Sequence, residues 1–105
     1  MKVLKDDIYL IIKRIFGRQH PLLPRIMINW PKIVGLKFSS ISYPLKISKS
    51  RDKGKEINIL HIQVKNSSIA LEMSFQQEII IERIALYLGF KLISSMRVTV
   101  YNEVS

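Results

Sequence analysis

The chain has 105 residues, which is about the length of one domain and too short for two units that each bury their own core. With 48% hydrophobic and 24% charged residues it has the composition of a folded globular protein, and the absence of cysteine excludes disulfides, thiol catalysis and Cys-based metal sites. The formal net charge is +9, and the first 65 residues hold 14 of the 17 Lys and Arg residues, so one side of the fold is expected to attract nucleic acid phosphates or anionic lipid head groups.

The first predicted element is an amphipathic helix over residues 4–16 that ends at Gly17. Its apolar residues recur at the spacing of one helix face: Leu4, Ile8, Ile11, Ile12 and Ile15. Its polar face includes Lys2, Lys5, Lys13 and Arg14. We interpret residues 1–17 as a basic amphipathic helix that docks on the core by its apolar stripe; the alternatives are a membrane surface and a partner protein. Because Asp6 and Asp7 interrupt the apolar run, no signal peptide is expected, and the protein is expected in the cytoplasm.

A second helical segment is predicted over about residues 25–40, after a connector that contains Pro21 and Pro24. Its apolar positions have helical spacing: Ile26, Trp30, Ile33, Val34, Phe38 and Ile41. Pro31 lacks a backbone donor, so the helix is expected either to kink there or to restart with Pro31 in its first turn. Trp30 is the single tryptophan. We expect it to be a buried core anchor, with an exposed stacking platform for bases as the alternative.

Two strands that form a hairpin are predicted next. In the first, Leu45 and Ile47 alternate with polar residues, and in the second Leu60, Ile62 and Val64 do so, which is the period of two of a half-buried strand. The charged turn around Gly54 carries four cations: Lys49, Arg51, Lys53 and Lys55. Such a tip is either a solvated loop or a device for holding a phosphate backbone.

A long helix is predicted over residues 68–88, capped by Asn66 or Ser67 and stopped by Gly89. It is apolar on two sides, one with Ile69, Met73, Ile80, Ile84 and Tyr87 and the other with Leu71, Phe75, Ile79 and Leu86. We favour a helix wedged between the sheet and the other helices over one whose second side meets a partner protein. In a last strand, Met96, Val98 and Val100 are expected to face inward and Arg97, Thr99 and Tyr101 outward.

The order helix, helix, strand, strand, helix, strand predicts an α+β domain with helices on one face of a small three-stranded sheet. No enzyme chemistry is visible, because the four glycines stand apart and no P-loop or nucleophile motif is present. Glu78 and Glu82 are interpreted as a solvated face, and His20 and His61 lack the spacing of metal ligands. No metal, cofactor or small-molecule substrate is therefore expected. A GXXG loop and an aromatic RNP motif, the usual signatures of RNA recognition, are also absent.

Several segments together resemble the DciA family of bacterial proteins, which operate the replicative helicase. They read NWPKIVG at residues 29–35, PL at 44–45, LHIQV at 60–64, IALEM at 69–73 and ERIALYLGF at 82–90. The resemblance covers about residues 18–102. It implies a KH-like domain that binds single-stranded DNA and a DnaB-type helicase and assists helicase loading without being an ATPase. The family often has a tryptophan where Ile69 stands, and many members extend into a disordered basic tail that is missing after Ser105.

The leading interpretation is thus an adaptor for the helicase and single-stranded DNA, and the alternative is an RNA-binding KH-like module of the ribosome or of RNA metabolism. For nucleic acid we select Lys46, Lys49, Arg51, Lys53, Lys55 and Lys65 of the hairpin, with Lys13, Arg14 and Arg18 as a second cluster. A weaker candidate is the polar face of the sheet, with His61, Gln63, Arg97, Thr99 and Tyr101. The family-motif residues Trp30, Pro31, Ile33, Val34 and Gly35 are interpreted as structural.

Overall fold

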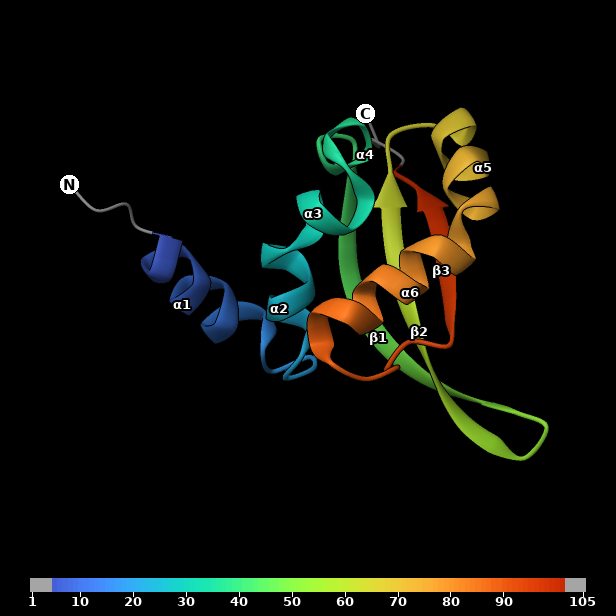
Figure 1. The fold of residues 1–105 in the computed structure, drawn as a ribbon, viewed down its shortest axis with the longest axis horizontal. Coiled ribbons are helices and arrows are strands. Elements are labelled where there is room, and N and C mark those ends of the chain that lie inside the picture. Colours follow the sequence, from blue (N-terminus) through green and yellow to red (C-terminus); the bar gives the residue numbers. More distant parts are fainter. Residues whose placement is uncertain (1–4, 102–105) are drawn as a thin grey trace.

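A computed structural model describes residues 5–101 of the chain and the side chains of residues 10–101. Its elements are α1 (Lys5–Phe16), α2 (Leu23–Ile28), α3 (Trp30–Val34), α4 (Leu36–Ser39), β1 (Ser42–Asp52), β2 (Lys55–Val64), α5 (Ser67–Phe75), α6 (Gln77–Leu88) and β3 (Ser95–Val100). The sheet has the order β1-β2-β3, with β1 antiparallel and β3 parallel to β2. Helices α2, α3 and α6 lie across one face of the sheet (Figure 1). The KH-like α+β fold that the sequence predicts is confirmed.

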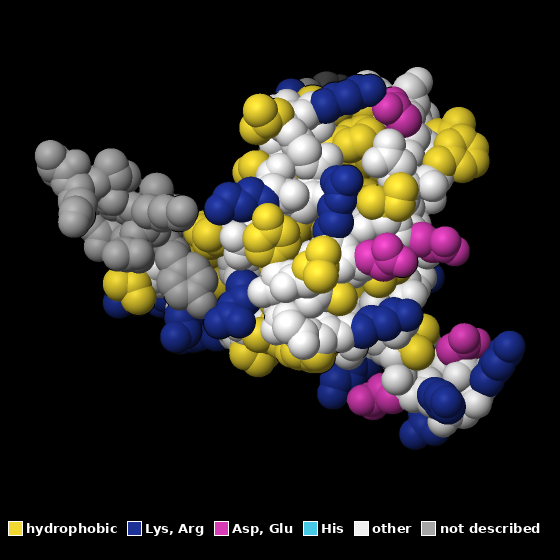
Figure 2. Space-filling model, viewed as in Figure 1, with side chains coloured by type: hydrophobic (Ala, Val, Ile, Leu, Met, Phe, Trp, Pro, Cys, Tyr) yellow, Lys and Arg dark blue, Asp and Glu magenta, His cyan; other side chains and the backbone are white. Residues whose placement is uncertain are grey.

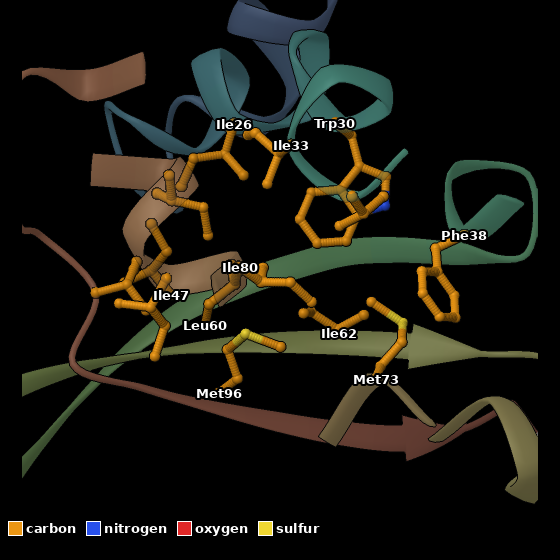
Figure 3. Packing of buried hydrophobic residues seen from close by; sticks show 14 of the residues in the cluster. Ile26, Trp30, Ile33, Phe38, Ile47, Leu60, Ile62, Met73, Ile80 and Met96 are labelled. Carbon is orange, nitrogen blue, oxygen red and sulfur yellow. The ribbon is translucent and has the colours of Figure 1, made fainter. Parts of the chain in front are cut away.

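The hydrophobic core lies between the sheet and these helices (Figure 3). Side chains alternate along a strand, so every second residue of β2 points toward the helices. The buried strand residues are Ile47, Leu60, Ile62, Val64 and Met96, and they meet helix residues that include Trp30, Ile33, Met73, Ile80 and Ile84. In β3 the predicted orientation is confirmed, because Val98 and Val100 pack against this core while Arg97, Thr99 and Tyr101 are exposed.

Three short helices stand where the sequence predicts one helical segment over residues 25–40. The helix α3 begins at Trp30 with Pro31 in its first turn, so of the two predicted effects of Pro31 the restart is confirmed. Gly35 then separates α3 from α4 with φ of 89°, a conformation that L side chains rarely adopt. Trp30 is 3% exposed, and its indole Nε1 donates a hydrogen bond to Ser42 Oγ at 3.0 Å. Its prediction as a core anchor is confirmed.

The long helix predicted over residues 68–88 is two helices, α5 and α6, that meet at Gln76. Its predicted ends are confirmed, because Asn66 Oδ1 accepts a hydrogen bond from the Ile69 N–H at 3.0 Å and Gly89 ends α6 in the left-handed conformation. Its predicted burial on two sides is wrong. The second apolar side is between 49% and 80% exposed: Leu71, Phe75, Ile79 and Leu86. The reason is that only the side carrying Met73, Ile80 and Ile84 meets the sheet, and no other element among residues 5–101 covers the opposite side.

Helix α1 extends away from the sheet (Figure 1). Leu10, Ile11 and Ile15 are 58–60% exposed, whereas Phe16 at the end of the helix packs against the core. The predicted docking of the apolar stripe is therefore wrong where the structure describes it, because α2 already covers the neighbouring part of the sheet. Leu4 and Lys2, and the side chains of Lys5 and Ile8, lie outside the described residues. None of the helices within residues 5–101 is long and apolar enough to cross a membrane.

Candidate nucleic-acid interface

The face of the sheet opposite the helices is polar and accessible. Residues paired across strands lie side by side, so the side chains form rows. Two rows cross all three strands: Tyr43, Gln63 and Thr99 form one, and Lys46, His61 and Arg97 form the other. The members on the outer strands are exposed, and those on the central strand are half-buried. Neither row contains a carboxylate, so this open face presents cations and an aromatic ring to solvent.

His61 stands at the centre of the open face. Its Nε2 lies 2.6 Å from Ser48 Oγ, within hydrogen-bond distance. Burial lowers the pKa of His61 from its ordinary value of 6.5, and the positive charges of Lys46 and Arg97 lower the pKa further. The ring is therefore neutral at pH 7. A phosphate placed between the two cations would offset their repulsion and raise the pKa of His61.

The β1–β2 hairpin continues beyond the open face as a two-stranded arm, residues 49–58, because β3 pairs only with residues 59–64 of β2. The arm projects from the body of the molecule (Figure 1). Lys53 and Gly54 at its tip both have positive φ, 52° and 80°, as in the two-residue type I′ turns whose twist matches that of the flanking strands. The predicted turn around Gly54 is confirmed.

The four cations of the arm, Lys49, Arg51, Lys53 and Lys55, are all exposed. Lys49 forms an exposed ion pair with Glu56, with 3.7 Å between Nζ and Oε1, and such a pair contributes little free energy. Lys46 lies at the base of the arm on the open face. Lys65 lies just beyond the opposite end of β2. Ten residues separate it from Lys55, which is about 33 Å in an extended strand, so the structure does not bring Lys65 to the arm.

The segment after α1 reaches the base of the arm. Gln19 binds the edge of β1 at Ile47, because its Nε2 donates to the Ile47 carbonyl at 2.7 Å and its Oε1 accepts from the Ile47 N–H at 2.9 Å. Burial lowers the pKa of His20, and the positive charge of nearby Lys49 lowers it further. Arg18 is therefore brought toward the arm. The other members of the predicted second cluster, Lys13 and Arg14, lie on α1, which leads away from it.

One residue of the open face, Tyr43, is missed by the sequence reasoning. Pro44 pairs with Ile62 and Lys46 with His61, so Leu45 is an extra residue in a β-bulge. The bulge buries Pro44 and leaves Leu45 exposed, which contradicts the predicted alternation of Leu45 with its neighbours. It also places Tyr43 and Lys46 on the same face. The available signal was Pro44 itself, because a proline inside a strand marks an edge strand or a bulge.

The other candidates for chemistry are not brought together. Glu78 and Glu82 are exposed on α6, and His61 lies on β2 whereas His20 lies in the segment between α1 and α2. Among the residues that the structure describes, no group of three or more His, Cys, Asp or Glu side chains is arranged to hold a metal ion. The accessible surface with a recognisable chemistry is thus the open face with the arm, which suits a flexible polyanion with stackable bases.

Comparison with known proteins shows similarity to one protein family and to a bacterial protein. A protein-family model described as "Dna[CI] antecedent, DciA" matches residues 10–98. A protein of Rickettsia prowazekii (strain Madrid E), named "Uncharacterized protein RP826", is 52% identical over 105 residues, which is 100% of this chain and 97% of that protein. The family match includes the NWPKIVG segment. In the structure this segment forms α3 and the turn after it, with Trp30, Ile33 and Val34 buried and Pro31 exposed.

Proposed function

The chain belongs to the DciA family, whose members act in helicase loading during DNA replication, and we propose that it is a non-enzymatic adaptor that binds single-stranded DNA and a DnaB-type helicase. The observation that carries the DNA part of the proposal is the continuity of the open face with the arm. Lys46 joins the two, because it belongs to the row with His61 and Arg97 and lies at the base of the arm.

Each part of this surface fits a different part of a DNA strand. The flexible side chains of the arm neutralise phosphates, which supplies affinity without reading sequence. Tyr43 and Tyr101, both about half exposed, offer rings on which unpaired bases stack. Gln63 and Thr99, between them on the sheet, supply hydrogen-bonding groups. A duplex has its bases stacked inside, so this combination favours a single strand.

The helicase part of the proposal has a thermodynamic consequence. A chain without a nucleotide site assists a helicase only through binding energy that favours a ring state competent for DNA entry. We therefore expect the isolated protein to show no ATP turnover, and its addition to the cognate helicase to increase the unwinding rate of a forked DNA substrate. The measurement is a strand-displacement assay with and without the protein, beside a binding assay for the complex.

Two outcomes of these assays separate the parts of the proposal. An unchanged unwinding rate together with no detectable complex would contradict the adaptor function and favour the RNA-binding alternative. A stable complex without faster unwinding would retain the helicase as partner but reject assistance to loading.

A second prediction concerns pH. A phosphate beside Lys46 and Arg97 raises the pKa of His61, so DNA binding takes up a proton and affinity is expected to increase as the pH falls from 7.5 to 5.5. The gain is limited to about tenfold for each unit by which DNA raises the pKa. The stability of the free protein should change in the opposite direction and decrease as the pH falls. Because its folded-state pKa is lowered, His61 contributes stability above pH 6.5 that is lost as the pH falls through the lowered value.

The test compares wild type with His61→Gln by fluorescence anisotropy on labelled single-stranded DNA at several pH values. His20→Gln is the comparison variant, because His20 also has a lowered pKa but lies near the arm cation Lys49 rather than in the row with Lys46 and Arg97. A pH dependence that survives in His61→Gln and disappears in His20→Gln would place the proton-linked phosphate contact at the arm near Lys49 and not on the open face.

A further inference from the structure

The outer side of α5 and α6 is an apolar surface that also carries negative charge. Its members are Leu71, Phe75, Glu78, Ile79, Glu82 and Leu86, which we call the α6 face. A shallow groove lined by Phe75, Glu78 and Ile79 hollows this surface, and a second groove at its edge is lined by Glu78 and Glu82 together with Lys91. Neither carboxylate forms an ion pair within residues 10–101. Figure 2 shows yellow apolar and magenta acidic side chains next to each other over these helices. Exposed apolar surface of this kind marks an interaction site.

Helix α1 carries the complementary pattern. At 100° per residue, Leu10, Arg14, Ile11 and Ile15 follow one another around the helix within an arc of about 140°, and all four are exposed. Lys13 flanks this arc next to Leu10. Ile12 and Phe16, on the other side, are partly covered by the body of the protein. On α6 the same construction places Glu78, Glu82, Leu86 and Ile79 within about 100°. Within residues 10–16, α1 thus presents apolar residues with cations, and α6 presents apolar residues with carboxylates.

We propose that α1 of one copy of this chain docks on the α6 face of a second copy. At about 1.5 Å per residue, the surface from Leu10 to Ile15 on α1 spans about 7.5 Å and that from Ile79 to Leu86 on α6 about 10.5 Å, so the two surfaces are similar in extent. Ile11 and Ile15 contact Phe75, Ile79 and Leu86 of the second copy. The cations Lys13 and Arg14 approach Glu78 and Glu82, which removes the mutual repulsion of two carboxylates one helical turn apart.

The contact forms between copies because α1 does not reach the α6 face of its own chain. Its end is fixed, since Phe16 packs against the core and Gln19 is bonded to Ile47 on β1. From there α1 points away from the body of the molecule (Figure 1). When two copies exchange α1 reciprocally, the contact occurs twice and the assembly closes as a twofold dimer rather than growing into a chain. This self-association goes beyond the proposed adaptor function and does not depend on it.

Sedimentation velocity of the full chain over a range of concentrations tests the docking. We expect wild type to reach twice the monomer mass. Ile11→Ser with Ile15→Ser should raise the dimer Kd at least about 100-fold, because four apolar side chains are lost per dimer. Phe75→Ser with Leu86→Ser should have a similar effect. Because this variant leaves α1 unchanged, its weaker dimer is not explained by unfolding of α1. The matched control is Leu36→Ser, because Leu36 on α4 is 82% exposed and lies outside both surfaces.

Charge reversal tests the specific pairing. Glu78→Lys with Glu82→Lys should weaken the dimer, and adding Lys13→Glu with Arg14→Glu to the same chain should restore it. A wild type that stays monomeric at the highest concentration overturns the proposal, as does a dimer unaffected by both serine double variants. The proposal is also overturned if the protein is monomeric and floats with anionic vesicles only when Ile11 and Ile15 are present. In that case α1 would be a membrane-surface helix. If wild type forms species larger than a dimer and the serine double variants abolish them, the docking is supported but the closed twofold dimer is rejected.

Discussion

Replacing Trp30 by alanine is expected to lower the free energy of unfolding by about 3–5 kcal/mol. Trp30 is almost completely buried, and its ring fills the space between α3 and the sheet beside Ile33 and Ile62 (Figure 3). Alanine loses this burial and leaves a cavity. Alanine also removes the indole N–H that donates a hydrogen bond to Ser42 Oγ. Ser42 is 1% exposed and keeps only the hydrogen bond that its hydroxyl donates to the Phe38 carbonyl at 2.5 Å. Chemical denaturation followed by circular dichroism measures the loss.

Trp30→Phe separates the two contributions. Phenylalanine keeps most of the apolar volume but leaves the buried Ser42 hydroxyl without its donor, so a smaller loss of about 1–3 kcal/mol is expected. A Trp30→Ala variant that melts within a few degrees of wild type and has lost DNA binding would show instead that the ring acts on the surface. That result would contradict its assignment to the core.

The strands and the helix ends were readable from the sequence because their causes are local. Leu60, Ile62 and Val64 alternate with polar residues, and a strand with one buried face requires this period. Asn66 and Gly89 have side-chain and backbone properties that favour the two ends of a helix wherever they occur. The break between α5 and α6 has no such local mark. Gln76 is neither glycine nor proline, and the break lets α5 lie against β3 while α6 crosses toward α2 and α3.

Whether an apolar stripe on a helix is buried or exposed could not be predicted from the sequence. Ile11 and Ile15 on α1 have the same spacing as buried residues, as do Ile79 and Leu86 on α6. Periodicity identifies a face, but burial depends on whether another element covers it, and that is a property of the whole fold. The same limit applies to the candidate interface. The arm cations were visible as a cluster along the chain, whereas the row of Lys46, His61 and Arg97 exists only once β3 pairs with β2.

The arm gives the prediction with the largest effect on DNA binding. Replacing Lys49, Arg51, Lys53 and Lys55 together by glutamine should leave the melting temperature nearly unchanged, because exposed charges contribute little to stability. Affinity for single-stranded DNA should fall strongly and by a similar factor for different sequences, since phosphate contacts carry no base information. If about four phosphates are neutralised there, the slope of log affinity against log salt should become shallower by about 3, at about 0.7 per contact.

The matched control removes the same charge from the helix side of the molecule. Arg25, Lys32, Lys37 and Lys91 are exposed, and their replacement by glutamine also removes one Arg and three Lys, so both variants lower the formal net charge from +9 to +5. A general electrostatic attraction responds equally to both variants, because it depends on net charge alone. Direct contact responds to the arm variant only. Equal salt slopes in the two variants would therefore identify the arm as a solvated turn, whereas a shallower slope confined to the arm variant places the phosphates along residues 49–58.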